Sequence, residues 1–159
     1  LSALTGAGWV KLGQRPAAAL QSSSADAQPS TDSADYQAIV AHLLALRDRA
    51  FSTARLAPLN DVYPNGSAGW QVDAAALQVL RSQHLHTRGF IERIDGLTVE
   101  DSAPASADLA VTTTIPAYVV VNAAGHVVAR RTGRTQSFDV VLQHAADRWL
   151  VQELRPTDS

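Results

Sequence analysis

The spacing of the apolar residues changes once along this chain, near Gly89. Before Gly89 they recur every three or four positions, which is the period of an amphipathic helix. After it they alternate in short runs rich in β-branched residues, which is the pattern of a strand. Helices that precede the strands predict an α+β fold, with the helices packed in the concave face of a bent, mostly antiparallel β-sheet, because a parallel α/β sheet needs helices between its strands.

The first half of the domain predicts two helices with a single helical turn between them, at 59–63. Asp and Ser residues at 32–35 are candidate caps of the first helix. We expect Arg47, Arg49 and Arg55 to lie near its end, where the helix dipole favours cations. Ser67 is a candidate N-cap of the second helix, which we expect to end near His84 with Trp70, Ala74, Leu77 and Leu80 at helical spacing. The apolar stripe of the first helix comprises Tyr36, Ile39, Val40, Leu43, Leu44, Arg47, Ala50, Phe51 and Ala54.

The second half predicts about five antiparallel strands. Gly96 is expected to mark a bulge, and Pro116 an edge or a bend within a long strand, because proline cannot donate to a strand ladder. A loop is expected at 101–108, a hairpin turn at 122–125 and a further turn at 144–147. The strand-like segments are 90–99, 109–121, 127–130, 135–143 and 149–154.

Composition excludes several classes of protein. The chain has 159 residues, of which 46% are hydrophobic and 18% are charged, as expected for one globular domain. It has no cysteine, which excludes disulfide scaffolds, thiolate zinc sites and cysteine nucleophiles. The net charge is −2, and no basic run is longer than the pair Arg130 and Arg131. We therefore expect no nucleic acid partner, since such binding requires a clustered cationic face.

Residues 1–34 are expected to form a leader and a flexible linker, and residues 35–156 the folded domain. The stretch 21–35 is rich in Ser, Ala, Asp, Gln and Pro, a composition typical of linkers. Because the chain starts at Leu1 and not at Met, we expect a segment upstream, and the apolar residues 1–10 suit the end of a membrane helix or signal region. The alternative is a short N-terminal peptide that docks on the domain.

The order of elements resembles the NTF2-like (nuclear transport factor 2-like, or SnoaL-like) superfamily, whose helices lie in the mouth of a bent antiparallel sheet. The resemblance covers about 35–155 and includes the Trp-centred last strand at 149–151. A set of core and turn residues is also similar to an extracytoplasmic module of actinobacterial membrane-anchored or lipoprotein-type proteins. These residues are Leu59, Val62, Tyr63, Gly66, Ser67, Asp73, Leu77, Leu80, Gly89, Ile115, Pro116, Ala117, Tyr118 and Gly125.

That narrower resemblance implies a non-enzymatic accessory domain, whereas the wider superfamily includes isomerases, dehydratases and polyketide cyclases. Enzymes of this fold place an acid or base inside the cone, and Asp61, Tyr63, Tyr118 and His126 are the residues to test for such a role. Asp61 also has a simpler interpretation as a solvent-facing residue of a short helix or turn, and Tyr63 and Tyr118 as core aromatics with the hydroxyl at the surface. We predict no catalytic residue, no metal and no cofactor.

A pocket in the cone would be lined by Tyr63, Trp70 and Tyr118, although the same aromatic side chains could equally fill it as core. His84 and His86 lack an apparent third metal ligand and are interpreted as part of a polar helix end. The segment 130–134, with three arginines, could bind an anionic head group or an acidic partner, or could protect a hairpin edge by its charge.

The sequence therefore predicts a non-enzymatic extracytoplasmic binding or accessory domain, tethered to the membrane, with a protein partner or a cell-envelope component as its target. The alternative is a small-molecule binding protein or a SnoaL-like isomerase or cyclase-type enzyme that uses the cone pocket. A homodimer through the open sheet face is a third hypothesis.

Overall fold

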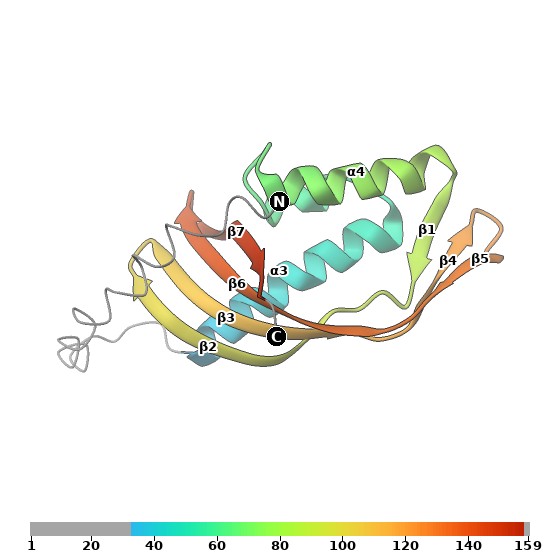
Figure 1. The fold of residues 1–159 in the computed structure, drawn as a ribbon. Coiled ribbons are helices and arrows are strands. Elements are labelled where there is room, and N and C mark those ends of the chain that lie inside the picture. Colours follow the sequence, from blue (N-terminus) through green and yellow to red (C-terminus); the bar gives the residue numbers. More distant parts are fainter. Residues whose placement is uncertain (1–32, 158–159) are drawn as a thin grey trace. The chain divides into compact units, whose positions relative to one another are not determined.

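The computed structural model describes residues 33–157, which belong to a compact unit that begins at Ser33. The predicted α+β class is confirmed, with two α-helices and a 3-10 helix followed by seven antiparallel strands in this part of the chain (Figure 1). The predicted leader and linker lie outside the described residues, apart from Ser33 and Ala34, which begin the first helix. The elements are α3 Ser33–Thr53, η3 Ala57–Asp61, α4 Ala68–Ser82, β1 Leu85–Arg88, β2 Arg93–Ala103, β3 Ser106–Ile115, β4 Tyr118–Asn122, β5 Val127–Arg131, β6 Arg134–Ala145 and β7 Arg148–Pro156.

Helix α3 lies across the concave side of the curved sheet (Figure 1). Its apolar stripe is buried as its spacing predicts, and it contacts η3, β1 and β2. None of the described helices is long and apolar enough to cross a bilayer. The buried residues of α3 are Tyr36, Val40, Leu43, Ala50 and Phe51.

Helix α4 begins at the predicted cap, because the Ser67 hydroxyl accepts a hydrogen bond from the backbone N–H of Trp70 at 3.4 Å. The middle helical segment is a 3-10 helix with proline in its first turn, so the turn expected at 59–63 starts slightly earlier. Gly69 lies against the ring of Tyr63, and a Cβ atom added there would be 2.6 Å from a ring carbon. The first turn of α4 therefore requires glycine at this position.

Hydrogen bonding divides the strands into two sheets, where a single bent sheet was predicted. The four-stranded sheet has the order β2-β3-β6-β7 and the three-stranded sheet the order β1-β4-β5. Two connections join the sheets. Pro116 and Ala117 connect β3 to β4, and Thr132 and Gly133 connect β5 to β6. Pro116 thus marks the expected bend. A Cβ atom on Gly133 would lie 2.9 Å from the backbone nitrogen of Ala117, so the two connections lie side by side in close contact.

Two sequence interpretations are wrong. The helix expected to reach His84 ends at Ser82, and Leu85–Arg88 forms strand β1, which pairs with β4. His84 takes a positive φ of 56°, which turns the chain between the helix and the strand. The pairing partner lies more than 30 residues further along the chain, so local spacing contains no signal for this strand.

The segment 101–108 is mostly strand, where a loop was expected. Strand β2 extends to Ala103, β3 starts at Ser106, and Ala103 pairs with Ser106 across a tight turn. Its Ser, Ala and Pro residues are typical of loops, but Ala107 is buried, and the backbone N–H of His144 donates to the Ala105 carbonyl at 2.8 Å. Tertiary pairing therefore overrides local propensity. The hairpin around 122–125 forms as predicted, and β2 has an irregularity between Ile94 and Gly96, as the bulge assignment required.

We predict that Gly69→Ala lowers the free energy of unfolding by about 1–3 kcal/mol, because the new methyl group overlaps the Tyr63 ring and overpacks the core. Gly96→Ala is the matched control, since a Cβ atom at Gly96 meets nothing within 4 Å. Urea denaturation of the two variants measures the difference. Equal stability of Gly69→Ala and wild type would contradict the close contact with Tyr63.

Candidate functional site

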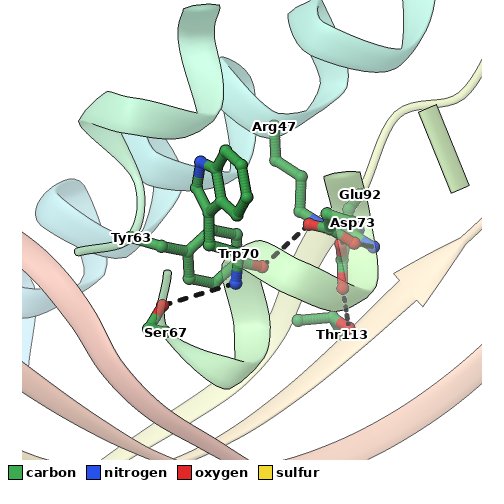
Figure 2. A network of polar contacts seen from close by, with 7 residues as sticks. All are labelled: Arg47, Tyr63, Ser67, Trp70, Asp73, Glu92 and Thr113. Atoms are coloured by element: carbon green, nitrogen blue, oxygen red, sulfur yellow. Dashed lines mark hydrogen bonds and ion pairs between the residues drawn. The ribbon is translucent and has the colours of Figure 1, made fainter. Parts of the chain in front are cut away.

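The centre of the concave interior holds an arginine between two carboxylates (Figure 2). Arg47 projects from the buried face of α3. Its Nε atom donates to Asp73 Oδ2 at 2.7 Å, and one terminal nitrogen donates to Asp73 Oδ1 at 3.0 Å. The other terminal nitrogen donates to Glu92 Oε2 at 2.8 Å. Asp73 comes from α4 and Glu92 from the segment before β2, so one guanidinium joins three separate parts of the chain.

Two neutral hydroxyls complete this network, which we call the Arg47 network: Arg47, Asp73, Glu92, Tyr63 and Thr113. The Tyr63 hydroxyl donates to Asp73 Oδ2 at 2.9 Å. The Thr113 hydroxyl, from the concave face of β3, donates to Glu92 Oε1 at 2.7 Å. Every carboxylate oxygen of the network therefore accepts a hydrogen bond from inside the protein, as buried charges require.

The surroundings keep the network charged and fixed. Burial alone would lower the pKa of Arg47, but its hydrogen bond to Asp73 and the nearby negative charges outweigh burial and raise that pKa. The guanidinium also lies 5.3 Å from the ring centre of Phe51 and 5.5 Å from that of Phe90, a cation–π arrangement. Burial, and then the charge of Asp73, raise the pKa of Tyr63, so its phenol stays protonated and remains a donor.

Asp48, the next residue on α3, has a carboxylate that is only partly hydrogen-bonded. Its Oδ2 atom accepts a hydrogen bond from the Glu92 backbone N–H at 3.1 Å, while Oδ1 is buried and has no hydrogen-bond partner among the described residues. Burial raises the pKa of Asp48 to about 6, and the charge of Glu92 acts in the same direction. The Glu92 N–H bond and the charge of Arg47 oppose this rise only in part.

The interior cavity beside the network is small. Its volume is about 70 Å³, far below the roughly 300–1,000 Å³ of pockets that hold drug-sized ligands. Tyr63, Arg47 and Glu92 form its polar wall; Arg47 donates to Glu92, and the Tyr63 hydroxyl donates to Asp73. The remaining walls are mainly apolar side chains of α3 and of the four-stranded sheet: Val40, Leu43, Leu44, Val62, Val111, Thr113, Gln136, Phe138, Val140, Val151 and Leu154.

One of the three aromatic residues predicted to line a ligand pocket lines the interior cavity. Tyr63 lies on the interior cavity. The Trp70 indole N–H donates to Asn60 Oδ1 at 3.0 Å in an exposed position. Tyr118 packs edge to face on Phe90, with ring centres 5.0 Å apart. A single pocket formed by these three residues is therefore not seen in the described structure, and ligand binding by Tyr63 alone stays a prediction.

The polar candidates from the sequence also lie apart. Asp61 is exposed and forms an ion pair with Arg148 of β7. His126 lies in the β4–β5 turn, where its backbone N–H donates to Asn122 Oδ1 at 2.9 Å. Of the four candidate acids and bases, Tyr63 is the one that reaches the interior. No group of three His, Asp or Glu side chains within residues 33–157 is placed to hold a metal ion.

A second hollow is a groove of about 550 Å³ lined by residues of α3, η3 and β7. Its floor is apolar, and Trp149 stands at one wall, packed edge to face on Tyr36. The ion pair of Asp61 with Arg148 lies at the rim. We call this hollow the α3 groove, and its lining residues are Ala38, Ile39, His42, Leu43, Leu46, Asp61, Arg148 and Trp149.

The Arg47 network was missed in the sequence, although one signal for it was present. Arg47 lies on the apolar stripe of α3, and Asp73 lies three residues after Trp70 and four before Leu77, on the buried side of α4. A charged residue at a core position must be paired, so an arginine and an aspartate on two facing stripes predict each other. The expectation that Arg47 lies near the helix end, where the dipole favours cations, is wrong, because α3 continues to Thr53 and its last turn holds no basic residue.

Comparisons with known proteins support the fold. No protein-family model matches the chain, and no curated protein matches it. The intermembrane space region of the chloroplast protein ARC6 is similar in structure, with a TM-score of 0.62, 16% identity, and coverage of 82% of this chain and 100% of that one. Aln2 from a Streptomyces species has a TM-score of 0.51 at 14% identity, covering 79% of this chain and 91% of that one.

A third similar structure, from Catenulispora acidiphila, has a TM-score of 0.50 at 14% identity, and the match covers 78% of this chain and 91% of that one. Identities this low show a shared fold and nothing about activity. The fold is the α+β arrangement expected of an NTF2-like cone.

We predict that Arg47→Leu lowers the free energy of unfolding by about 3–5 kcal/mol, because it leaves the carboxylates of Asp73 and Glu92 buried without their cation. Arg49→Leu is the control, since Arg49 is an exposed arginine on the same helix. Urea denaturation monitored by circular dichroism measures both. A loss from Arg47→Leu no larger than that from Arg49→Leu would contradict a stabilising role for the network.

We predict that Asp48→Asn stabilises the protein at pH 7 and has little effect at pH 4. The folded-state pKa of Asp48 is raised to about 6 from 3.8, so the folded form holds a proton that the unfolded form releases between these values. Stability therefore falls as pH rises from 4 to 6, and asparagine removes that loss. Solvent screening of the partly exposed side chain reduces the expected gain to about 1 kcal/mol.

Thermal and urea unfolding at several pH values measure this difference between wild type and Asp48→Asn. Asp147→Asn serves as the control, because Asp147 is exposed and its positive φ of 62° suits asparagine. An equal gain for Asp48→Asn at pH 4 and pH 7 would refute the assigned titration.

Proposed function

We propose that this domain is a non-enzymatic binding module that holds a partner protein in the α3 groove. The observation that carries the proposal is the contrast between the two hollows. The interior cavity of about 70 Å³ has its charged groups bonded to one another, whereas the α3 groove of about 550 Å³ is open and has an apolar floor. We therefore place binding of a partner at the surface of the domain, in the α3 groove, and not in its interior.

The chemistry of the groove indicates what it binds. Leu43 and Leu46 on α3 and Trp149 on β7 form an apolar floor, and aromatic residues at such positions frequently dominate the binding energy of an interface. The ion pair between Asp61 and Arg148 supplies a polar rim that can fix the orientation of a bound segment. These features suit apolar side chains on a helix or loop of another protein.

The alternative, a small-molecule binder or an enzyme that uses the cone pocket, receives less support. The interior cavity is too small for a substrate of drug size, and Glu92, the carboxylate that lines it, is bonded to Arg47. A carboxylate held in this way is not free to take a proton from a substrate.

We further propose that the domain lies outside the cytoplasm and is tethered to a membrane. Supporting the proposal are the linker-like composition of 21–35 and the fold shared with a region whose name places it in an intermembrane space. Protease protection of the full-length protein in intact cells and in isolated membranes tests the location. Resistance to protease in intact cells, with recovery of the protein in the soluble cytoplasmic fraction, would contradict it.

For the groove itself we predict that Ala38→Arg abolishes binding of a partner, whereas Ala41→Arg does not. Ala38 is exposed and lines the groove, so an arginine there fills the hollow without removing any core side chain. Ala41 is exposed on the same helix outside the groove and is the matched control. The measurement is affinity capture from a membrane extract of the source organism, followed by titration of each captured protein.

A protein that wild type and Ala41→Arg retain and that Ala38→Arg loses supports the proposal. Retention of the same proteins at equal affinity by all three forms would show that the α3 groove is not the binding surface.

A further inference from the structure

A second surface, separate from the α3 groove, is formed by the outer edge of β5 and the start of β6. Strand β5 is the last strand in the order β1-β4-β5, so its outer side has no strand neighbour among residues 33–157. The described pairing of β7 with β6 stops at Phe138, with one further bond from the Thr157 N–H to the Ser137 carbonyl. The edge from Val127 to Gln136, which we call the free edge, therefore leaves backbone donors and acceptors unused by the described sheet.

The free edge is strongly cationic. Arg130, Arg131 and Arg134 lie on it and are exposed. Arg88 of β1 and Arg130 of β5 both pair with Val119 of β4. At ordinary strand spacing their Cα atoms are therefore about 10 Å apart. Arg93, at the start of β2 in the neighbouring sheet, pairs with Thr114 of β3. Thr114 pairs in turn with Thr135, near the start of β6.

These arginines are not neutralised within the described structure. The ion pairs of residues 33–157 use Arg47, Arg148 and Arg155 and none of these five side chains. Of the nearby carboxylates, Glu92 is bound to Arg47, and Asp95 accepts a hydrogen bond from the Thr114 hydroxyl. A chain with net charge −2 thus gathers five arginines around one junction.

The free edge also exposes apolar side chains. Val127 and Val128 begin β5, with exposed fractions of 37% and 51%. An edge that is only protected against aggregation carries charge and few exposed apolar residues, because adjacent apolar side chains attract a further strand. The combination of a valine pair and an arginine cluster instead matches a partner that has both apolar and acidic residues.

We propose that the free edge binds an extended acidic segment of a protein partner, which adds to β5 as an antiparallel strand. We infer the direction of the added strand from β7, which is antiparallel to β6. A partner strand that extends the line of β7 along β5 runs in the same direction as β7. The N-terminal half of the segment then lies along Arg134, Arg131 and Arg130, where acidic residues are complementary. Its C-terminal half lies along Val128 and Val127, where apolar residues are complementary.

Binding requires one small rearrangement. A terminal nitrogen of Arg131 donates to the Arg130 carbonyl at 3.5 Å, a long and weak contact. An incoming carboxylate is a stronger acceptor for this guanidinium, so the contact is exchanged at little cost.

The experiment uses fluorescence anisotropy with a labelled peptide that is acidic in its N-terminal half and valine-rich in its C-terminal half. We expect binding that weakens with added salt and that falls at least about tenfold in the double variant Arg130→Gln and Arg131→Gln. The double variant Arg49→Gln and Arg81→Gln is the control, because both arginines are exposed and belong to the helices and not to β5 or β6. It should bind like wild type.

Two further comparisons separate strand addition from simple charge attraction. A reversed peptide, valine-rich first and acidic last, has the same composition and should bind more weakly. Replacing Val127 and Val128 by threonine should also weaken binding of the forward peptide. The groove variant Ala38→Arg should bind the peptide normally, so failure of the α3 groove proposal and failure of this one are distinguishable.

Several results would overturn the proposal. These are no binding of the forward peptide, equal or tighter binding of the reversed peptide, or equal binding by the arginine variant and wild type. Arginine-dependent binding to phosphatidylglycerol vesicles without peptide binding would assign the surface to a membrane instead. Self-association that is lost in the arginine variant, again without peptide binding, would assign it to a second copy of the chain.

Discussion

The structure depends on a single buried interaction, the contact of Arg47 with Asp73 and Glu92. Placing three charged groups inside a domain costs several kcal/mol for each ion, and only close pairing with full hydrogen bonding offsets that cost. The pairing fixes α3, α4 and the entry to β2 at one point, and Thr113 links this point to the sheet. A slip of α3 by one residue would move Arg47 off the carboxylates, so the network specifies how the helices sit on the sheet.

The same interaction determines where function can lie. In a cone-shaped fold the interior is the natural place for a substrate, but here its centre is occupied by charges that satisfy one another. A cavity of about 70 Å³ remains. Two surfaces outside the interior are open for binding: the apolar groove along α3 and the cationic strand edge at β5. Both suit protein segments better than small molecules, which unites the two proposals.

Local pattern predicted much of the fold, and its failures have identifiable physical causes. The stripe of α3, the Ser67 cap and the hairpin after Tyr118 depend on neighbours in sequence, and each formed as predicted. Strand β1 and the segment 101–108 depend on partners far along the chain. Their local composition therefore predicted a helix end and a loop where the structure has strands. The division into two sheets coincides with the close contact of Gly133 with Ala117, which local sequence pattern does not encode.

The site was harder to predict than the fold, because it consists of residues whose roles exist only in pairs. From the sequence, Arg47 was expected to be a cation near the end of its helix. Asp73 was one of the core and turn residues of the family resemblance, and no partner was expected for it. The measurement that tests the account most directly is a double-mutant cycle between them, with Arg47→Leu, Asp73→Leu and the double variant compared by urea unfolding. The account predicts that the double variant loses less stability than the two single variants lose in sum. Arg47→Leu leaves Asp73 and Glu92 without their cation, and Asp73→Leu leaves two donors of Arg47 unpaired, whereas the double variant leaves only Glu92 as an unpaired charge. Additive losses would show that the two residues do not depend on each other and would contradict the central role of their contact.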